Sequence, residues 1–209
     1  MNVVEVLRSD RVLSVVRAQR IPDAADLCHA LAAGGIRTVE LTFTTPDVLR
    51  HVKSSSAAVA RSGIVLGVGT VMTADQASAA IDAGARFLVT PGLRTEVAAV
   101  AVAHGVPVFL GALTPTEVAA AVDLGSAAVK IFPAGAFGPK YLTDLGGPYP
   151  GMEFLPSGGI NPDNARAYLD AGALAVCAGT GVVPPAQVAG GDWPGITARA
   201  AQFVAALTA

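Results

Sequence analysis

Short apolar runs alternate with longer, alanine-rich segments along the whole chain. The runs are nearly continuous rather than alternating with polar residues, which is typical of parallel strands covered on both faces. They fall at residues 12–16, 38–43, 64–68, 87–89, 106–110, 127–132, 153–156 and 174–178. Regular alternation of strand and helix predicts right-handed crossovers between parallel strands.

The segments between the runs carry helix start signals. Thr73 and Gln76 have the spacing of a capping box, and Thr114 and Glu117 repeat it with a proline at the first helical position. Asn161 followed by proline opens a third helix in the same way. Further helices are expected at residues 3–8 and 196–207, the second introduced by the sequence Gly-Gly-Asp.

Eight strand–helix units favour closure into one α/β domain, a (β/α)₈ TIM barrel over residues 1–209. The alternative is an open doubly wound sheet, in which a glycine-rich phosphate-binding turn should follow the first strand. Residues 17–20, which follow that strand, contain no glycine. The pattern therefore favours the barrel.

Composition limits the class of partner. The formal net charge is -2 and the sequence has no block of Lys or Arg, so binding to nucleic acid or to a membrane surface is not expected. The apolar stretch 97–113 is interrupted by His104, Gly105 and Pro107 and falls short of the roughly 18 residues of a membrane span. A small-molecule substrate fits this composition better.

Cysteine usage and the first residues bear on the compartment. Cys28 and Cys177 stand apart from any other cysteine, which predicts small buried side chains rather than a disulfide or a metal site. The first eleven residues carry acidic side chains and lack the apolar core of a secretory signal. We therefore expect a cytoplasmic protein.

Lys130 is the candidate nucleophile. It lies inside an apolar run, where burial would disfavour the charged ammonium and make neutral amine available to attack a ketone. Lys53 and Lys140 are expected in a polar helix end and in a loop, as ordinary charged groups. The alternative role for Lys130 is one half of a buried structural ion pair.

Glu40 is the candidate acid and base. It also lies inside an apolar run, four strands from Lys130, which in an eight-stranded barrel means the opposite wall. Burial raises the pKa of a carboxyl group and a nearby ammonium lowers it, so Glu40 could both take and give protons. A salt-bridged core carboxylate is the alternative.

Glycine-rich segments follow the last two strands. Ser157, Gly158 and Gly159 follow one strand, and Gly179 and Thr180 follow the next. In TIM barrels this is the usual place for a phosphate, bound by backbone amides and helix N-termini. Glycines acting only as turn residues are the alternative.

The sequence resembles the class I aldolases that cleave 2-keto-3-deoxy-6-phosphogluconate (KDPG), and often 4-hydroxy-2-oxoglutarate (KHG), to release pyruvate. The resemblance covers nearly the whole chain. It rests, in order, on VELTFT (39–44), GVGTV (67–71), TPGL (90–93), LTPTE (113–117), VKIFPAGAFGPKYL (129–142), LPSGGIN (155–161) and AGTGV (178–182).

The resemblance implies roles for these residues. Lys130 would be the Schiff-base lysine and Glu40 the general acid and base, with Thr70 and Pro91 beside the pyruvyl group and Phe132 packing against the site. The phosphate would lie near Ser157, Gly158, Gly159, Gly179 and Thr180. A homotrimer acting in carbohydrate metabolism, in the Entner–Doudoroff pathway, is also implied.

Three positions depart from the commoner family pattern. One branch of the family carries a carboxylate-binding arginine four residues after the glutamate, where this chain has Thr44. The branch that this sequence resembles has an arginine after the first strand instead, and we hypothesise that Arg17 binds an anionic end of the substrate. Leu110 and Ala178 replace a proline and a glycine, and the second change affects the predicted phosphate contacts.

The expected reaction needs no metal or other cofactor, because an iminium on Lys130 does the work that a divalent cation does in class II aldolases. His29, His51 and His104 fall in helical segments without partners at metal-ligand spacing. Alternatives are an aldolase for the phosphogalactonate epimer, a phosphosugar isomerase or synthase using Glu40 as base, and a non-catalytic sugar-phosphate-binding barrel. The sequence does not decide the configuration at C4.

Overall fold

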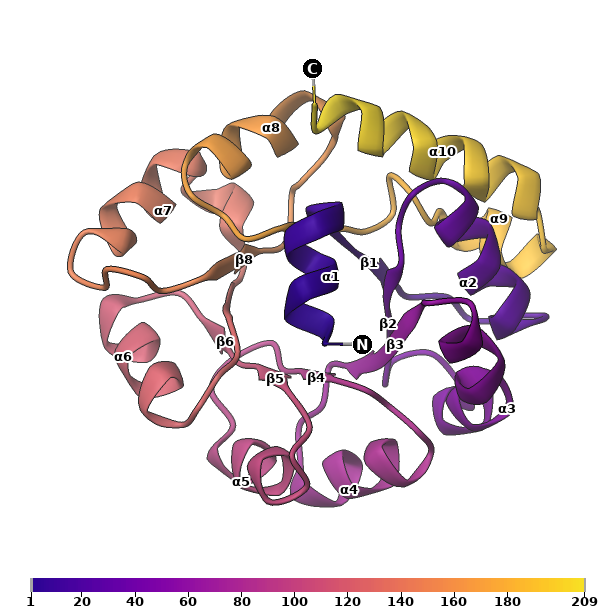
Figure 1. Cartoon of the computed structure of the whole chain (residues 1–209), viewed down its shortest axis with the longest axis horizontal. Coiled ribbons are helices and arrows are strands. Elements are labelled where there is room, and N and C mark those ends of the chain that lie inside the picture. Colours follow the sequence, from indigo (N-terminus) through magenta and orange to yellow (C-terminus); the bar gives the residue numbers. More distant parts are fainter. Residues whose placement is uncertain (1, 209) are drawn as a thin grey trace.

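The computed structural model describes residues 2–208, so residues 1 and 209, the two ends of the predicted domain, lie outside the described residues. Parallel strands form the centre and helices surround them, with helix α1 across the middle of the ring in Figure 1. The strands are β1 Val12–Val16, β2 Thr38–Thr42, β3 Val65–Gly69, β4 Leu88–Val89, β5 Val108–Phe109, β6 Gly111–Ala112, β7 Val129–Ile131, β8 Phe154–Pro156 and β9 Val176–Ala178. The α/β class is confirmed.

Helices and strands alternate as the hydrophobic pattern predicts, except that β6 follows β5 directly and α10 follows α9 directly. The helices are α1 Val3–Asp10, α2 Ala24–Ala33, α3 Val48–Arg61, α4 Ala74–Asp82, α5 Thr95–Ala103, α6 Pro115–Asp123, α7 Pro139–Gly146, α8 Pro162–Asp170, α9 Pro185–Gly190 and α10 Trp193–Ala206, with a 3₁₀ turn at Ala134–Ala136. No helix within residues 2–208 is long and apolar enough to cross a membrane.

The strands form two parallel sheets. One has six strands in the order β5-β4-β3-β2-β1-β9, and the other has three in the order β6-β7-β8. The single eight-stranded sheet expected from the sequence is thus not found as such. The division falls at the end of the predicted strand 106–110, because β5 ends at Phe109 and a second short strand, β6, begins after Leu110.

The division at Leu110 has a local cause. The Leu110 amide donates to the Ser126 hydroxyl, 2.9 Å away, and the same hydroxyl donates to the Ala128 carbonyl at 2.7 Å. A side chain therefore replaces part of the backbone hydrogen bonding between the strands. Backbone hydrogen bonds still cross the division, from Ala127 N to Val108 O at 2.8 Å and from Lys130 N to Leu110 O at 2.9 Å. Between β8 and β9, Leu174 N donates to Phe154 O at 2.9 Å.

The predicted helix caps are largely confirmed. Thr114 and Glu117 form a reciprocal capping box at α6, and Asn161 caps α8. The box predicted at α4 is only half formed. Thr73 accepts from the Gln76 amide as expected, but the Gln76 side chain reaches one residue further back and accepts from the amide of Met72.

Three helix assignments differ from the sequence expectation. Lys140 was expected in a loop but lies in α7, where it pairs with Asp144 one turn later at 2.7 Å. Helix α9 was not expected. The final helix begins at Trp193 rather than at residue 196, because the Asp192 carboxylate caps it by accepting from the Gly195 amide at 3.0 Å.

The buried side chains form two clusters, one on each face of the strands. The outward cluster packs the strands against helices α2 to α10. The inward cluster joins Leu13, Phe87 and Phe109 to Val6 and Leu7 of α1. Helix α1 therefore closes the end at which the strands begin.

Two ion pairs link α1 to residues just before the start of strands β8 and β2. Arg8 bonds Glu153, just before β8, at 2.5 Å, and Asp10 bonds Arg37, just before β2, at 2.5 Å. The candidate site lies at the opposite end of the molecule, where the strands finish.

Candidate active site

Lys130 and Glu40 meet at the centre of the molecule. Lys130 is the middle residue of β7 and Glu40 the middle residue of β2, so they come from different sheets. They are 6% and 0% exposed, and Lys130 Nζ lies 3.9 Å from Glu40 Oε2. Within residues 2–208 neither oxygen of Glu40 has a hydrogen-bond partner, since 3.9 Å is too long for one. The two side chains that the sequence analysis proposes as a catalytic pair therefore lie next to each other.

The environment of Glu40 alters its acidity. Burial raises the pKa of its carboxyl above the usual 4.5, while the charges of Lys130 and, more weakly, Arg17 act in the opposite direction. The net pKa is raised, as expected for a carboxyl group enclosed by apolar strands. Such a group can exchange a proton nearer to neutral pH than an exposed glutamate can.

A cavity of about 420 Å³ lies at the C-terminal ends of β1, β8 and β9. Seven of the predicted site residues line it: Arg17, Phe132, Ser157, Gly158, Gly159, Gly179 and Thr180. Lys130 reaches towards it, with its Nζ 5.7 Å from the centre of the Phe132 ring. The buried amine thus lies behind Phe132, one of the residues that line the cavity.

Thr70 and Pro91 are not part of the lining of that cavity within the described residues. Thr70 is nevertheless linked to it, because Arg17 Nη2 donates to the Thr70 hydroxyl at 3.5 Å. Pro91 is half-buried, and its backbone lies so close to Gly111 that a Cβ there would be 2.3 Å from the Pro91 carbonyl carbon. Thr70 follows β3, which pairs with β2, and Pro91 follows β4, which pairs with β5. Both residues therefore lie at the end of the molecule where the strands finish.

The turn at Ser157–Gly159 is held through its carbonyl oxygens. Those of Ser157 and Gly158 accept from the amides of Ala134 and Gly135 at 2.8 Å, and that of Gly159 accepts from the side chain of Asn164 at 2.9 Å. Gly158 and Gly159 have φ of +87° and +79°, which a side chain would strain. Their own amides donate to no acceptor among residues 2–208, which leaves two donors beside the cavity.

Cys177 also lines the cavity, although its sequence context predicts only a packing role. Burial raises the pKa of its thiol to about 12, so it is a neutral group near Lys130, Glu40 and Ser157. The predicted buried, free state of both cysteines is confirmed. Alternation along β9 could have indicated Cys177, because it lies two residues before Gly179 and shares its face.

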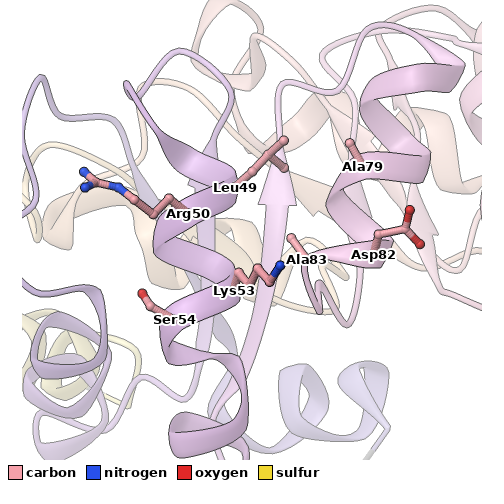
Figure 2. Close-up of a pocket in the computed structure, with 7 residues that line it drawn as sticks. All are labelled: Leu49, Arg50, Lys53, Ser54, Ala79, Asp82 and Ala83. Atoms are coloured by element: carbon pink, nitrogen blue, oxygen red, sulfur yellow. The ribbon is translucent and has the colours of Figure 1, made fainter.

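A second hollow lies on the outer surface, between α3 and α4 (Figure 2), and measures about 550 Å³. Lys53 and Asp82 line it together with Leu49, Arg50, Ser54, Ala79 and Ala83. Lys53 is exposed there, as predicted, and does not line the cavity at the strand ends.

The three histidines lie on the outer helices or their ends. His29 and His51 are in α2 and α3, and His104 follows α5 with its ring bonded to the Val100 carbonyl at 2.8 Å. Within the part of the chain that the structure describes, no group of three His, Cys, Asp or Glu side chains could hold a metal ion.

Comparison with known proteins identifies the family. The sequence model of the KDPG and KHG aldolase family matches residues 3–199. The chain belongs to this family. The seven motifs therefore reflect true membership of the KDPG and KHG aldolases.

Individual members of the KDPG and KHG aldolases are similar over almost their full length. The 2-dehydro-3-deoxy-phosphogluconate aldolase of Treponema pallidum is 37% identical, over 97% of this chain and 96% of its own. The KHG/KDPG aldolase of Escherichia coli is 31% identical, over 95% and 93%.

A solved structure extends the similarity to three dimensions. It is KDPG aldolase from Legionella pneumophila with pyruvate captured at low pH as a covalent carbinolamine intermediate. Its TM-score is 0.87 at 30% identity, covering 95% of this chain and 96% of that one.

Proposed function

We propose that this chain is a class I aldolase, a carbon–carbon lyase that reversibly cleaves KDPG to pyruvate and glyceraldehyde 3-phosphate. Cleavage of KHG to pyruvate and glyoxylate is the expected side activity. The observation that carries the proposal is the buried pair of Lys130 and Glu40, 3.9 Å apart beside a cavity. The names of the relatives in the same family support the choice of substrate.

In the proposed reaction Lys130 forms a covalent bond to the substrate. Its neutral amine adds to the C2 ketone, and loss of water gives an iminium that can accept an electron pair at C2. The carbinolamine trapped in the Legionella pneumophila enzyme is the kind of intermediate that precedes such an iminium.

Glu40 would then move the protons. It takes the proton of the C4 hydroxyl, the C3–C4 bond breaks, and the electron pair of that bond passes to the iminium as the aldehyde leaves. The remaining enamine takes a proton from Glu40 at its terminal carbon, and water hydrolyses the resulting imine to free pyruvate. The raised pKa of Glu40 supports both steps.

Two groups of donors would hold the charged ends of the substrate. We propose that Ser157, Gly158, Gly159, Gly179 and Thr180 hold the phosphate. Thr70 and Pro91 would lie beside the pyruvyl group, with Phe132 against the site. Because Arg17 bonds Thr70, we propose that Arg17 holds the carboxylate end rather than the phosphate.

We also propose that the two sheets act together as the wall of one (β/α)₈ barrel and one domain. The backbone bonds across the divisions at Leu110 and at Phe154–Leu174 support closure, as does the shared inward cluster. A homotrimer in the cytoplasm is proposed from the family resemblance, and the two free cysteines fit a reducing compartment. Sedimentation analysis would test the trimer.

The decisive experiment is borohydride reduction in the presence of pyruvate, followed by intact-mass analysis and peptide mapping. We expect one pyruvyl-sized adduct on Lys130, its loss in Lys130→Ala, and its retention in Lys53→Ala and Lys140→Ala. The two control lysines are exposed, and one of them is paired with Asp144. An unmodified wild-type protein would reject the aldolase and favour the isomerase, or the non-catalytic binding protein if turnover is also absent.

A further inference from the structure

The guanidinium of Arg17 is held by hydroxyl groups. Its Nη1 donates to Thr44 Oγ1 at 2.6 Å, and its Nη2 donates to Thr70 Oγ1 at 3.5 Å. Among residues 2–208 no carboxylate forms an ion pair with it. Its positive charge at the cavity is therefore oriented without being neutralised, which suits the capture of an anion.

Thr44 is itself held by Thr42. The two hydroxyl oxygens lie 2.8 Å apart, and Thr42 Oγ1 also lies 3.1 Å from the carbonyl oxygen of Val16. A carbonyl oxygen can only accept a hydrogen bond, so the Thr42 hydroxyl donates its one proton to the Val16 carbonyl. Thr44 must then donate to Thr42, which leaves a lone pair of Thr44 to accept from Arg17.

These contacts fix the donor and the acceptor in each hydrogen bond of the series. The order runs from Arg17 to Thr44, to Thr42 and to the backbone of Val16, the residue before Arg17. Thr42 is fully buried in β2, whereas Thr44 and Arg17 are exposed at the mouth. The guanidinium of Arg17 is thus connected by hydrogen bonds to the ends of strands β1 and β2.

We infer that Thr42 and Thr44 are positioning residues that hold Arg17 in the orientation needed to bind the substrate carboxylate. This inference rests on the proposed function, in which Arg17 binds that carboxylate. Neither threonine needs to touch the substrate, because each acts through the guanidinium. A guanidinium fixed before binding gives up less conformational freedom when the anion arrives.

The first test is Thr44→Val, which keeps the shape of the side chain and removes both its donor and its acceptor. We expect KM for KDPG, and the pyruvate concentration for half-maximal borohydride trapping, to rise about tenfold, equivalent to roughly 1.4 kcal/mol. We expect kcat to change less than about twofold, since Lys130 and Glu40 are untouched. Thr44→Ser should restore KM, and Thr143→Val, an exposed threonine of α7, should leave both constants unchanged.

A double-mutant cycle separates positioning from direct contact. In an Arg17→Ala background, Thr44→Val should have no further effect on KM, because its effect passes through Arg17. An equal rise in both backgrounds would mean that Thr44 contacts the substrate and would overturn the inference. An unchanged KM in Thr44→Val with wild-type Arg17 would overturn it as well.

The same measurements distinguish failure of the inference from failure of the proposed function. If Arg17→Ala raises KM but Thr44→Val does not, only the positioning role is wrong. If Arg17→Ala leaves KM unchanged, the carboxylate role of Arg17 is wrong and the inference falls with it. If the wild-type protein gives no adduct with pyruvate, the aldolase itself is wrong.

Discussion

Gly69 makes room for the carboxylate of Glu40. A Cβ at this position would lie 1.7 Å from Glu40 Oε1 and 2.1 Å from its Cδ, which no side chain could tolerate without moving. Glycine at the end of β3 is therefore required by the side chain on the neighbouring strand β2.

Gly69→Ala should displace that carboxylate and lower kcat by about 100-fold, the effect of a misplacement of roughly 1 Å. Steady-state kinetics and borohydride trapping would be compared, and trapping by Lys130 should persist. Gly190→Ala is a matched control, because a Cβ at Gly190 meets nothing within 4 Å. Full activity in Gly69→Ala would argue against Glu40 as the acid and base.

Glu40 should also make stability depend on pH. Its pKa is raised in the folded protein, so folding favours the protonated form, and stability falls as pH rises above the unfolded value of 4.5 through the folded pKa. Glu40→Gln lacks this loss. The difference in free energy of unfolding between variant and wild type should therefore grow with pH above 4.5, by at most about 1.4 kcal/mol per pH unit.

Urea unfolding of both proteins from pH 4 to pH 8 would measure that difference. A difference that shrinks as pH rises would mean that the charged carboxylate is stabilised in the fold, as in a structural ion pair, which was the alternative role for Glu40.

At the residue scale, sequence predicts polar side chains that interrupt apolar strands, and so Lys130 and Glu40 could be found. It does not predict side chains that act by local geometry. Thr42 and Thr44 are ordinary strand residues in sequence, and only their distances to Val16 and Arg17 reveal the hydrogen-bonded chain. The only unusual feature of Thr44 in sequence is that it replaces an arginine of one branch of the family.

At the scale of elements, α6 begins with a complete capping box. Thr114 accepts from the Glu117 amide, and the Glu117 carboxylate accepts from the amides of Thr114 and Leu113 at 2.8 Å each. These hydrogen bonds, first those to the two backbone amides, lower the pKa of Glu117. The box fixes where the helix starts after β6.

Thr114→Ala should reduce the free energy of unfolding by about 1 kcal/mol, the usual cost of losing a threonine N-cap. Urea denaturation would measure it, with Thr116→Ala, an exposed threonine two residues into the same helix, as the control. Because alanine has the higher helix propensity, Thr116→Ala should not destabilise the helix. An equal loss in both variants would mean that the cap is not what Thr114→Ala removes.

Helix starts with strong capping signals could be read from sequence, whereas strand continuity could not. The run 106–110 looks uniform, and the interruption at its last residue depends on Ser126, sixteen residues later in the chain, whose hydroxyl accepts from the Leu110 amide. A contact between distant segments of this kind leaves no periodic signal. Helix α7 was missed for a different reason, because Gly138 and Pro139 are as typical of a loop as of a helix start.

At the scale of the whole molecule, α1 acts as a floor beneath the strands. Val3, Val6 and Leu7 are buried against the inward cluster, and Leu7 is 0% exposed. Figure 1 shows this helix across the middle of the ring. The sequence predicted a short helix at this position but not that it would fill the end of the proposed barrel.

Leu7→Ala should lower the free energy of unfolding by about 2 to 5 kcal/mol, the usual cost of a buried leucine. The kcat of the folded fraction should be unchanged, because the site lies at the opposite end of the strands. Chemical denaturation and kinetics below the unfolding transition would test both statements. A loss below about 1 kcal/mol would mean that α1 packs less tightly than its burial indicates.

The packing of α1 across one end of the strands has a kinetic consequence for the proposed aldolase. With α1 buried at one end of the strands, substrate and products would pass through the cavity beside Arg17 and Phe132 at the other end. The aldehyde is free as soon as the C3–C4 bond breaks, whereas the pyruvyl fragment stays attached to Lys130 until water has entered through the same cavity and hydrolysed the imine. Products should then leave in a fixed order, aldehyde first and pyruvate last, so that pyruvate alone can rebind the empty enzyme and compete with substrate.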